Sequence, residues 1–240
     1  LKVVKAYRYL GRDEEALDLI AQALARDENV SGTDRPFDDA DENLNWLYNE
    51  LAYILVGQGD VEGGINTFRK AIAFGESGED NVSQVINLSF ILMFEGRYEE
   101  AEDLLSIVGN ASEFGRMFAL AIEVCAAHEA GETEHMTEVL DEMKAHRFDN
   151  YSALQFALAC VEDEEASAEL LIERLSQPDY QDQAFMSLHT IRKTGVHQRR
   201  QKDILEFLDL VHQRPDVVAA AASIGRVLDL PVYSFYWGDI

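Results

Sequence analysis

The chain is poor in proline, cysteine and basic residues, and each shortage excludes something. Only four prolines occur in 240 residues, so long stretches can stay helical without interruption. Lys and Arg number 20 against 45 Asp and Glu, which gives a formal net charge of −25. A field of this sign repels nucleic acid and anionic lipid, so we do not expect nucleic acid binding. The charge fits either a partner rich in Lys and Arg or simply a solvated acidic surface.

Two cysteines, Cys125 and Cys160, are too few for a disulfide framework or a zinc site. Both lie in apolar stretches, where cysteine usually behaves as a small buried hydrophobe. We therefore expect them to be unbonded, and we expect a cytoplasmic location. No apolar run is long enough to cross a bilayer, and no signal peptide is visible. The chain opens at Leu1 inside an apparent helix, so we interpret it as a fragment that lacks an upstream part.

Motifs for catalysis are also missing. The sequence has no glycine-rich phosphate loop and no zinc spacing, and its six histidines are scattered. A lone histidine in a helix is usually a surface or core residue rather than a catalytic base. We therefore predict no cofactor, no metal and no enzymatic activity.

What the chain does contain is a repeated phrase. Residues 9–20 read "YLGRDEEALDLI", and residues 94–105 read "FEGRYEEAEDLL". In both stretches a glycine is followed five residues later by an alanine and then by large apolar residues at helical spacing; in the copy at Gly131 the alanine is replaced by Met136. The glycine position is filled by Gly11, Gly59, Gly96 and Gly131, and by Asp163 in a weaker fifth copy.

This phrase predicts pairs of helices. The glycine permits the sharp turn that ends the first helix. The small residue lets the second helix approach the first closely, and the large apolar residues fill the space between them. One such hairpin cannot bury its apolar faces alone, so consecutive hairpins are expected to stack.

The pattern resembles the tetratricopeptide repeat, whose period is about 34 residues. The resemblance covers residues 1–176 in approximately five copies, of which the first is truncated. It implies an all-α fold, a right-handed superhelical stack whose first helices line a concave groove. Residues 177–240 would form an atypical helical C-terminal cap with an aromatic tail.

The resemblance also implies which side chains face the groove. Aromatic anchors with adaptable amides suit recognition of a peptide. We therefore predict a protein–protein interaction scaffold that binds a peptide or partner protein, basic or apolar-aromatic, in the groove. Alternatives are a sensor module of a larger bacterial regulator and a chaperone for a secreted or assembling subunit. The predicted binding residues are Trp46, Asn49, Tyr53, Asn87, Phe90, Phe94, Phe118 and Ile122.

The repeat fades after Pro178, and we expect further helices over 181–194, over 201–213 and from Pro215 onward through "PDVVAAAASIGRVLDL". The basic stretch between them would contact an anion or pair with carboxylates of this or a neighbouring chain. Its charged residues are Arg192, Lys193, Arg199, Arg200 and Lys202.

Two further segments stand out. Residues 25–43 read as an extended acidic loop, either a functional arm or an inert surface connection. The tail "PVYSFYWGDI" holds Tyr233, Phe235, Tyr236 and Trp237, whose exposure to water would be costly. We expect the tail to pack on the last helices, in the chain's own groove, or in a partner, including a second copy of the chain.

Overall fold

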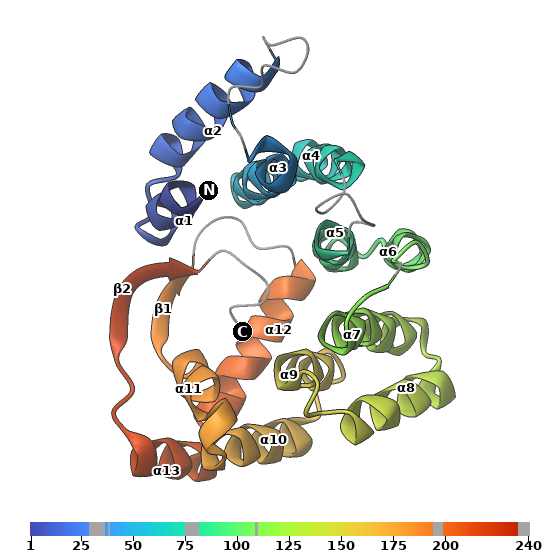
Figure 1. Ribbon diagram of the computed structural model, residues 1–240. Helices are drawn as coiled ribbons and strands as arrows, with labels where there is room; N and C mark the ends of the chain where they lie inside the picture. The colour runs from blue at the N-terminus through green and yellow to red at the C-terminus, as the bar shows by residue number, and fades with distance from the viewer. Residues whose placement is uncertain (29–36, 38, 75–81, 109, 194–198, 235–240) are drawn as a thin grey trace.

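The computed structural model describes residues 1–28, 37, 39–74, 82–108, 110–193 and 199–234 (Figure 1). In this part of the chain there are thirteen α-helices and two short β-strands. The prediction of a predominantly helical protein is confirmed. Both ends of the predicted acidic loop, residues 25–28 and 40–43, are helical, which corrects its bounds, and residues 29–36 and 38 lie outside the described residues. Of the aromatic tail, residues 235–240 lie outside the described residues.

The first ten helices form five consecutive hairpins, and in each hairpin the two helices pack against each other. In addition, α5 packs on α7 and α7 packs on α9, so neighbouring hairpins stack. Figure 1 shows the hairpins following one another along an arc. The pairs are α1 (Lys2–Tyr9) with α2 (Asp13–Glu28), α3 (Ala40–Gly57) with α4 (Val61–Ala73), α5 (Ser83–Phe94) with α6 (Tyr98–Leu105), α7 (Glu113–Ala130) with α8 (Thr133–Ala145), and α9 (Tyr151–Cys160) with α10 (Glu164–Ser176).

The four glycines of the repeated phrase lie at the turns between paired helices, as predicted. Their φ angles are +70° at Gly11, +90° at Gly59 and +73° at both Gly96 and Gly131. This left-handed conformation is readily adopted by glycine and is the usual way to end a helix. At the third turn, the Gly96 and Arg97 amides each donate to helix carbonyls over 2.9 Å, which satisfies groups that the helix end leaves free.

The fifth turn corrects the sequence alignment by one residue. Glu162, with φ of +55°, holds the left-handed position that we assigned to Asp163. Asp163 instead caps α10, because its side chain accepts a hydrogen bond from the Ala166 amide. The shift places the small residue Ser167 and the large Leu171 at the repeat's packing positions, and both are fully buried. The alignment failed because Ala168 resembles the expected small residue more closely than Ser167 does.

Close approach of paired helices is evident at Gly64, the small residue of the second hairpin. A Cβ atom added there would collide with the Val56 side chain and lie 3.0 Å from the carbonyl oxygen of Ala52. Ala16 and Ala101 hold the same position in the first and third hairpins, and both have no exposed surface. The small residue is therefore required by contact between the helices.

The C-terminal third was predicted to be helical, but it contains two short strands in addition to helices. Its elements are α11 (Pro178–Ser187), β1 (Thr190–Lys193), α12 (Arg199–His212), α13 (Pro215–Ile224) and β2 (Asp229–Ser234). The helix expected over 201–213 is confirmed. The one expected over 181–194 ends at Ser187, and the one from Pro215 ends at Ile224. The two strands pair in parallel, with Thr190 opposite Asp229 and Ile191 opposite Leu230.

The C-terminal elements lie inside the arc and at its opening (Figure 1). Helix α12 packs on α5, α9 and α10, and α13 packs on α10. Strand β2 contacts α1, where a Cβ atom at Gly11 would lie 2.5 Å from the Tyr233 ring. The last described strand therefore meets the first helix, and the arc of hairpins is closed by its own C-terminal segment.

Candidate protein-binding surface

The predicted groove residues divide into two sets. Five are buried, namely Asn49, Tyr53, Phe90, Phe94 and Ile122. Three are partly exposed, namely Trp46, Asn87 and Phe118. Three of the predicted residues, Phe90, Phe94 and Phe118, form an aromatic strip together with Phe156, and most of this strip lies within the protein core.

The buried aromatic rings pack on one another between hairpins. The Phe90 ring lies 5.0 Å from the Phe156 ring of α9 and 6.0 Å from the Phe118 ring of α7, each edge to face. Ile204 and Leu208 of α12 belong to the same core cluster. Because α12 occupies the inside of the arc, residues that would line an open groove are instead covered by the chain itself.

The predicted amides bond to each other. The Asn87 side chain donates a hydrogen bond to the Asn49 side-chain oxygen over 2.8 Å. This bond connects α5 to α3. In this structure, the two residues therefore join neighbouring hairpins through their side chains.

The first two hairpins are joined by a buried ion pair. Arg8 donates to the Glu50 carboxylate over 2.8 Å, and both side chains are almost completely buried. Lys5 lies 3.9 Å from the same carboxylate and 5.5 Å from the Trp46 ring centre. Glu50 of α3 is therefore an internal counterion for basic side chains of α1.

The aromatic strip continues outward to a side chain that the sequence analysis did not name. The Phe114 ring lies 5.3 Å from the Phe118 ring, one helical turn earlier on α7, and Phe114 is 54% exposed. The strip therefore runs from the core at Phe156, through Phe90 and Phe118, to the protein surface.

A second aromatic group lies at the start of the next hairpin. Phe148 is 51% exposed, and its ring packs edge to face on the Tyr151 ring. The Tyr151 ring in turn packs on the Tyr180 ring, with 4.6 Å between the ring centres. The Asn150 side chain donates a hydrogen bond to the Phe114 carbonyl over 3.1 Å and so connects the two groups. We call this surface the aromatic edge. It consists of Phe114, Phe118, Phe148, Tyr151 and Tyr180.

Charged contacts hold the aromatic edge in place. The Arg147 guanidinium lies over the Phe148 ring at 4.4 Å and donates to Glu173 over 3.0 Å. The Tyr151 hydroxyl also donates to Glu173, over 2.9 Å. Burial raises the pKa of Tyr151, and its bond to Glu173 raises the pKa further. Burial alone would raise the pKa of Glu173, but hydrogen bonds from Arg147 and Tyr151 outweigh it and lower that pKa. Glu173 is therefore held as an anion.

The sequence carried a signal for Phe114 but none for Phe148. Phe114 lies four residues before Phe118, so extending the helical spacing by one turn would have found it. Phe148 belongs to the connection between α8 and α9, where no period applies.

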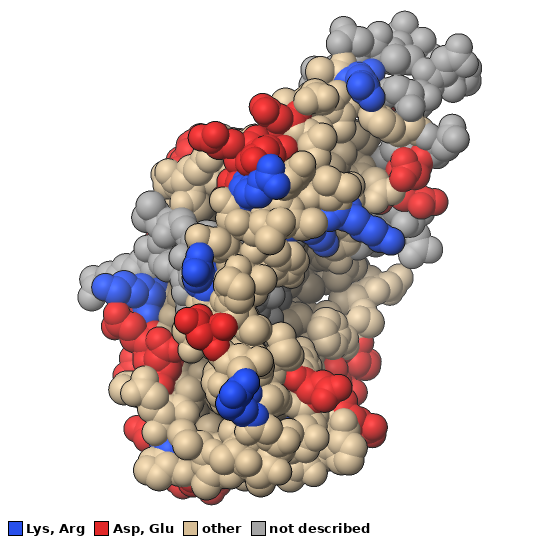
Figure 2. Space-filling model, turned by 90° about the vertical axis from the view of Figure 1, so that its left-hand side faces the viewer, with Lys and Arg blue, Asp and Glu red and all other residues tan. Residues whose placement is uncertain are grey.

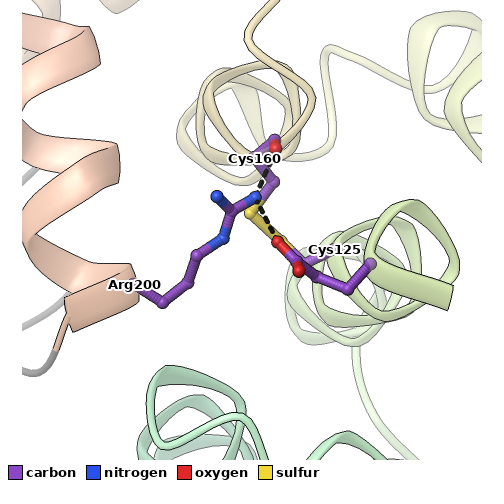
Figure 3. The surroundings of a disulfide bond; sticks show 4 residues. Cys125, Cys160 and Arg200 are labelled. Atoms are coloured by element: carbon purple, nitrogen blue, oxygen red, sulfur yellow. Dashed lines mark hydrogen bonds and ion pairs between the residues drawn. A yellow bond between two sulfur atoms is a disulfide. The ribbon is translucent and has the colours of Figure 1, made fainter. Parts of the chain in front are cut away.

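The two cysteines are joined, which corrects the prediction that they are unbonded. Cys125 of α7 and Cys160 of α9 form a disulfide with their Cα atoms 5.3 Å apart (Figure 3). They lie on the first helices of neighbouring hairpins, six residues before Gly131 and two before Glu162. This placement was a usable signal that cysteine counting ignored.

The basic stretch pairs with the chain's own groups wherever its side chains are described. Arg200 donates to the Cys160 carbonyl over 2.6 Å and lies 3.1 Å from the Glu129 carboxylate (Figure 3). Lys202 lies 3.6 Å from Glu206 on the same helix. Intramolecular pairing is therefore the better interpretation for these residues. The Lys193 and Arg199 side chains lie outside the description.

The surface seen in Figure 2 carries acidic side chains in several separate clusters. No continuous basic patch interrupts them on this face. Within the described residues, no group of three or more potential metal ligands comes together. None of the helices described is both long and apolar enough to traverse a membrane.

Comparison with known proteins adds no identification. No family model matches the chain, and neither a curated protein nor a solved structure is detectably similar to it.

Proposed function

We propose that this chain is a binding module for another protein, built as a right-handed stack of tetratricopeptide-like hairpins. The left-handed turn residues, the close approach at Gly64 and the packing of α7 between α5 and α9 support this architecture. Each is a property expected of stacked helical hairpins, which provide rigid and extended surfaces for partners.

The contact surface that we assign is the aromatic edge. The observation that carries this assignment is that Phe114 of α7 and Phe148 of the α8–α9 connection are each about half exposed, and that Arg147 lies over the Phe148 ring. Aromatic residues and arginine dominate the binding energy of protein interfaces. Rings already fixed by packing on Phe118 and Tyr151 would lose little side-chain entropy on binding.

The partner that fits this surface presents an apolar side chain flanked by Lys or Arg. The net charge of −25 attracts a basic segment and disfavours an acidic one. Glu113 precedes Phe114 and Asp149 follows Phe148 in sequence, and both carboxylates are at least partly exposed. The module supplies binding, and we assign no catalytic role to it.

Capture experiments with surface variants test this function. The double variant Phe114→Ser/Phe148→Ser should lose, by at least about tenfold, a partner that the unaltered chain captures from its source extract. Both rings are half exposed, so the helical circular dichroism signal should be unchanged. Phe74→Ser is the matched control, because Phe74 is also a partly exposed aromatic but lies at the end of α4.

Equal loss of capture by the Phe74 variant would show non-specific apolar binding and contradict the assignment. Retained capture by the double variant would exclude the aromatic edge as the contact surface. The pair Tyr53 and Phe90 is unsuitable for this test because both are core residues, and their replacement would unfold the protein.

A further inference from the structure

The disulfide lies at a covered position in the stack. Cys125 and Cys160 have no exposed surface, and their helices belong to neighbouring hairpins. The bond closes a loop with a sequence separation of 35, which contains all of α8. It therefore joins the fourth hairpin to the fifth covalently.

We propose that this bond is made in a compartment that keeps thiols oxidised, by a protein disulfide donor that acts before α9 docks on α7. The completed fold then shields the bond from reductants. This proposal competes with the cytoplasmic location expected from the small number of cysteines, because structural disulfides rarely persist in a reducing cytosol.

The order of events follows from access. Thiol–disulfide exchange requires a thiolate to reach a sulfur atom. In the folded chain neither cysteine residue is exposed, so a protein-sized donor cannot reach either sulfur. Stacked hairpins bury their faces only when the next hairpin docks. Because α9 packs against α7, the Cys125 thiol is accessible until α9 arrives.

The chemistry balances with a donor that itself carries a disulfide. One cysteine thiolate attacks the donor's disulfide, which forms a mixed disulfide and releases one donor thiolate. The thiolate of the second cysteine then attacks the mixed disulfide, so the Cys125–Cys160 bond forms and the second donor sulfur leaves. The two protons that the cysteine thiols lose are taken up, through solvent, by the two donor thiolates, so the donor gains two electrons and two protons and ends as a dithiol.

Helix α12 completes the cover on the Cys160 side. Arg200 donates to the Cys160 carbonyl and pairs with Glu129, so it holds α12 against both hairpins that the disulfide joins (Figure 3). The Arg200 side chain is only 14% exposed. Loss of this residue should loosen the cover without removing either cysteine.

Alkylation followed by intact mass measurement tests the state of the bond. The chain is produced with export to an oxidising compartment, unfolded in denaturant and treated with iodoacetamide, with and without prior reduction. We expect no alkyl group without reduction and two after it. Two alkyl groups without reduction would overturn the proposal.

Reduction kinetics test the shielding. Dithiothreitol should reduce the native chain at least ~100-fold more slowly than the chain in denaturant, because reduction requires local opening. Arg200→Ala should accelerate native reduction by about tenfold and leave reduction in denaturant unchanged. Lys202→Ala is the matched control, since Lys202 lies on the same helix and is exposed, and its native rate should not change.

Equal reduction rates in native and denatured chains would refute the shielding. Equal acceleration by the Arg200 and Lys202 variants would show that Arg200 does not hold the cover. The requirement for an oxidising compartment is tested separately by producing the same chain in a reducing cytosol. There the proposal predicts free thiols and lower yield, and a complete disulfide would contradict it. None of these outcomes depends on partner binding at the aromatic edge.

Discussion

Gly64 and Gly115 are both buried helix residues, but their surroundings differ. At Gly64 an added Cβ would collide with Val56, whereas at Gly115 the nearest atoms would be 3.6 Å away, an ordinary contact distance. Replacement of glycine by alanine inside a helix normally stabilises a protein by about 0.5–1 kcal/mol. Overpacking of a helix contact costs about 1–3 kcal/mol.

We therefore predict opposite effects of the same substitution at these two glycines. Gly64→Ala should lower the free energy of unfolding by about 1–2 kcal/mol, because overpacking outweighs helix propensity. Gly115→Ala should raise it by up to about 1 kcal/mol. Urea denaturation followed by circular dichroism measures both. A stabilising Gly64→Ala would mean that the paired helices are not in tight contact.

Two buried arginines also invite comparison. Arg8 pairs with the buried Glu50, whereas Arg174, 1% exposed, donates to Ser152 over 3.3 Å and pairs with no carboxylate among the described residues. Burial lowers the pKa of Arg174 to about 10. The folded state therefore binds this proton less tightly than the unfolded state does. The resulting destabilisation is complete below pH 10 and fades as the pH rises above it.

We predict that Arg174→Met is neutral or stabilising at neutral pH, by up to about 2 kcal/mol, because it removes an uncompensated buried charge. Arg8→Met should destabilise by about 3 kcal/mol, because Glu50 would remain buried without its partner. Thermal and urea unfolding of both variants measure the difference. Strong destabilisation by Arg174→Met would instead indicate that the guanidinium has a stabilising partner.

At the scale of elements, local patterns were predictable and long-range pairing was not. Gly59, Gly96 and Gly131 were identified as turns because backbone conformation at a helix end depends on neighbouring residues. Strand β1 was read as helix because its partner, β2, lies far along the chain, and pairing of distant segments leaves no local period.

The candidate site shows the same division. The groove set expected from the resemblance included Phe90 and Phe118, whose ring centres lie 6.0 Å apart, but the resemblance could not show that α12 would cover this face. Phe114 is exposed because the cover provided by α12 does not extend over it, and the sequence pattern could not predict where this cover ends. Residue spacing therefore identified which side chains share a face, whereas their exposure was decided by elements outside the repeat.

The link between α7 and α9 makes an element-scale prediction. Cys125→Ala/Cys160→Ala should lower the free energy of unfolding by about 3–4 kcal/mol, as expected for a loop of this length. Denaturation in urea without reductant provides the measurement. Wild-type chain that has been reduced in denaturant should then show the same midpoint as the variant in the presence of reductant. A difference of less than about 1 kcal/mol between variant and oxidised wild type would contradict the structural role of the bond.

The whole molecule is closed by contact between its first helix and its last described strand. Tyr233 of β2 lies against Gly11, and Arg192 of β1 lies 5.7 Å from the Tyr233 ring centre. A linear stack of hairpins would leave α1 as a terminal helix with one face uncovered, and terminal helices open readily. In this structure β2 contacts α1, so the stability of the N-terminal hairpin depends on the C-terminal segment.

We predict that removal of residues 229–240 increases hydrogen exchange in α1 by at least about tenfold. Tyr233→Ala should act in the same direction, because it removes the described contact at Gly11 without shortening the chain. The amides of α7 and α9 are the internal reference, since their hairpins pack on each other away from β2. Val218→Ala, at an exposed position of α13, is the control variant. If exchange in α1 is unchanged while the reference helices stay protected, closure by β2 does not stabilise the first hairpin. If all helices exchange faster together, the C-terminal segment stabilises the stack as one cooperative unit, and the specific contact at Gly11 is not its cause.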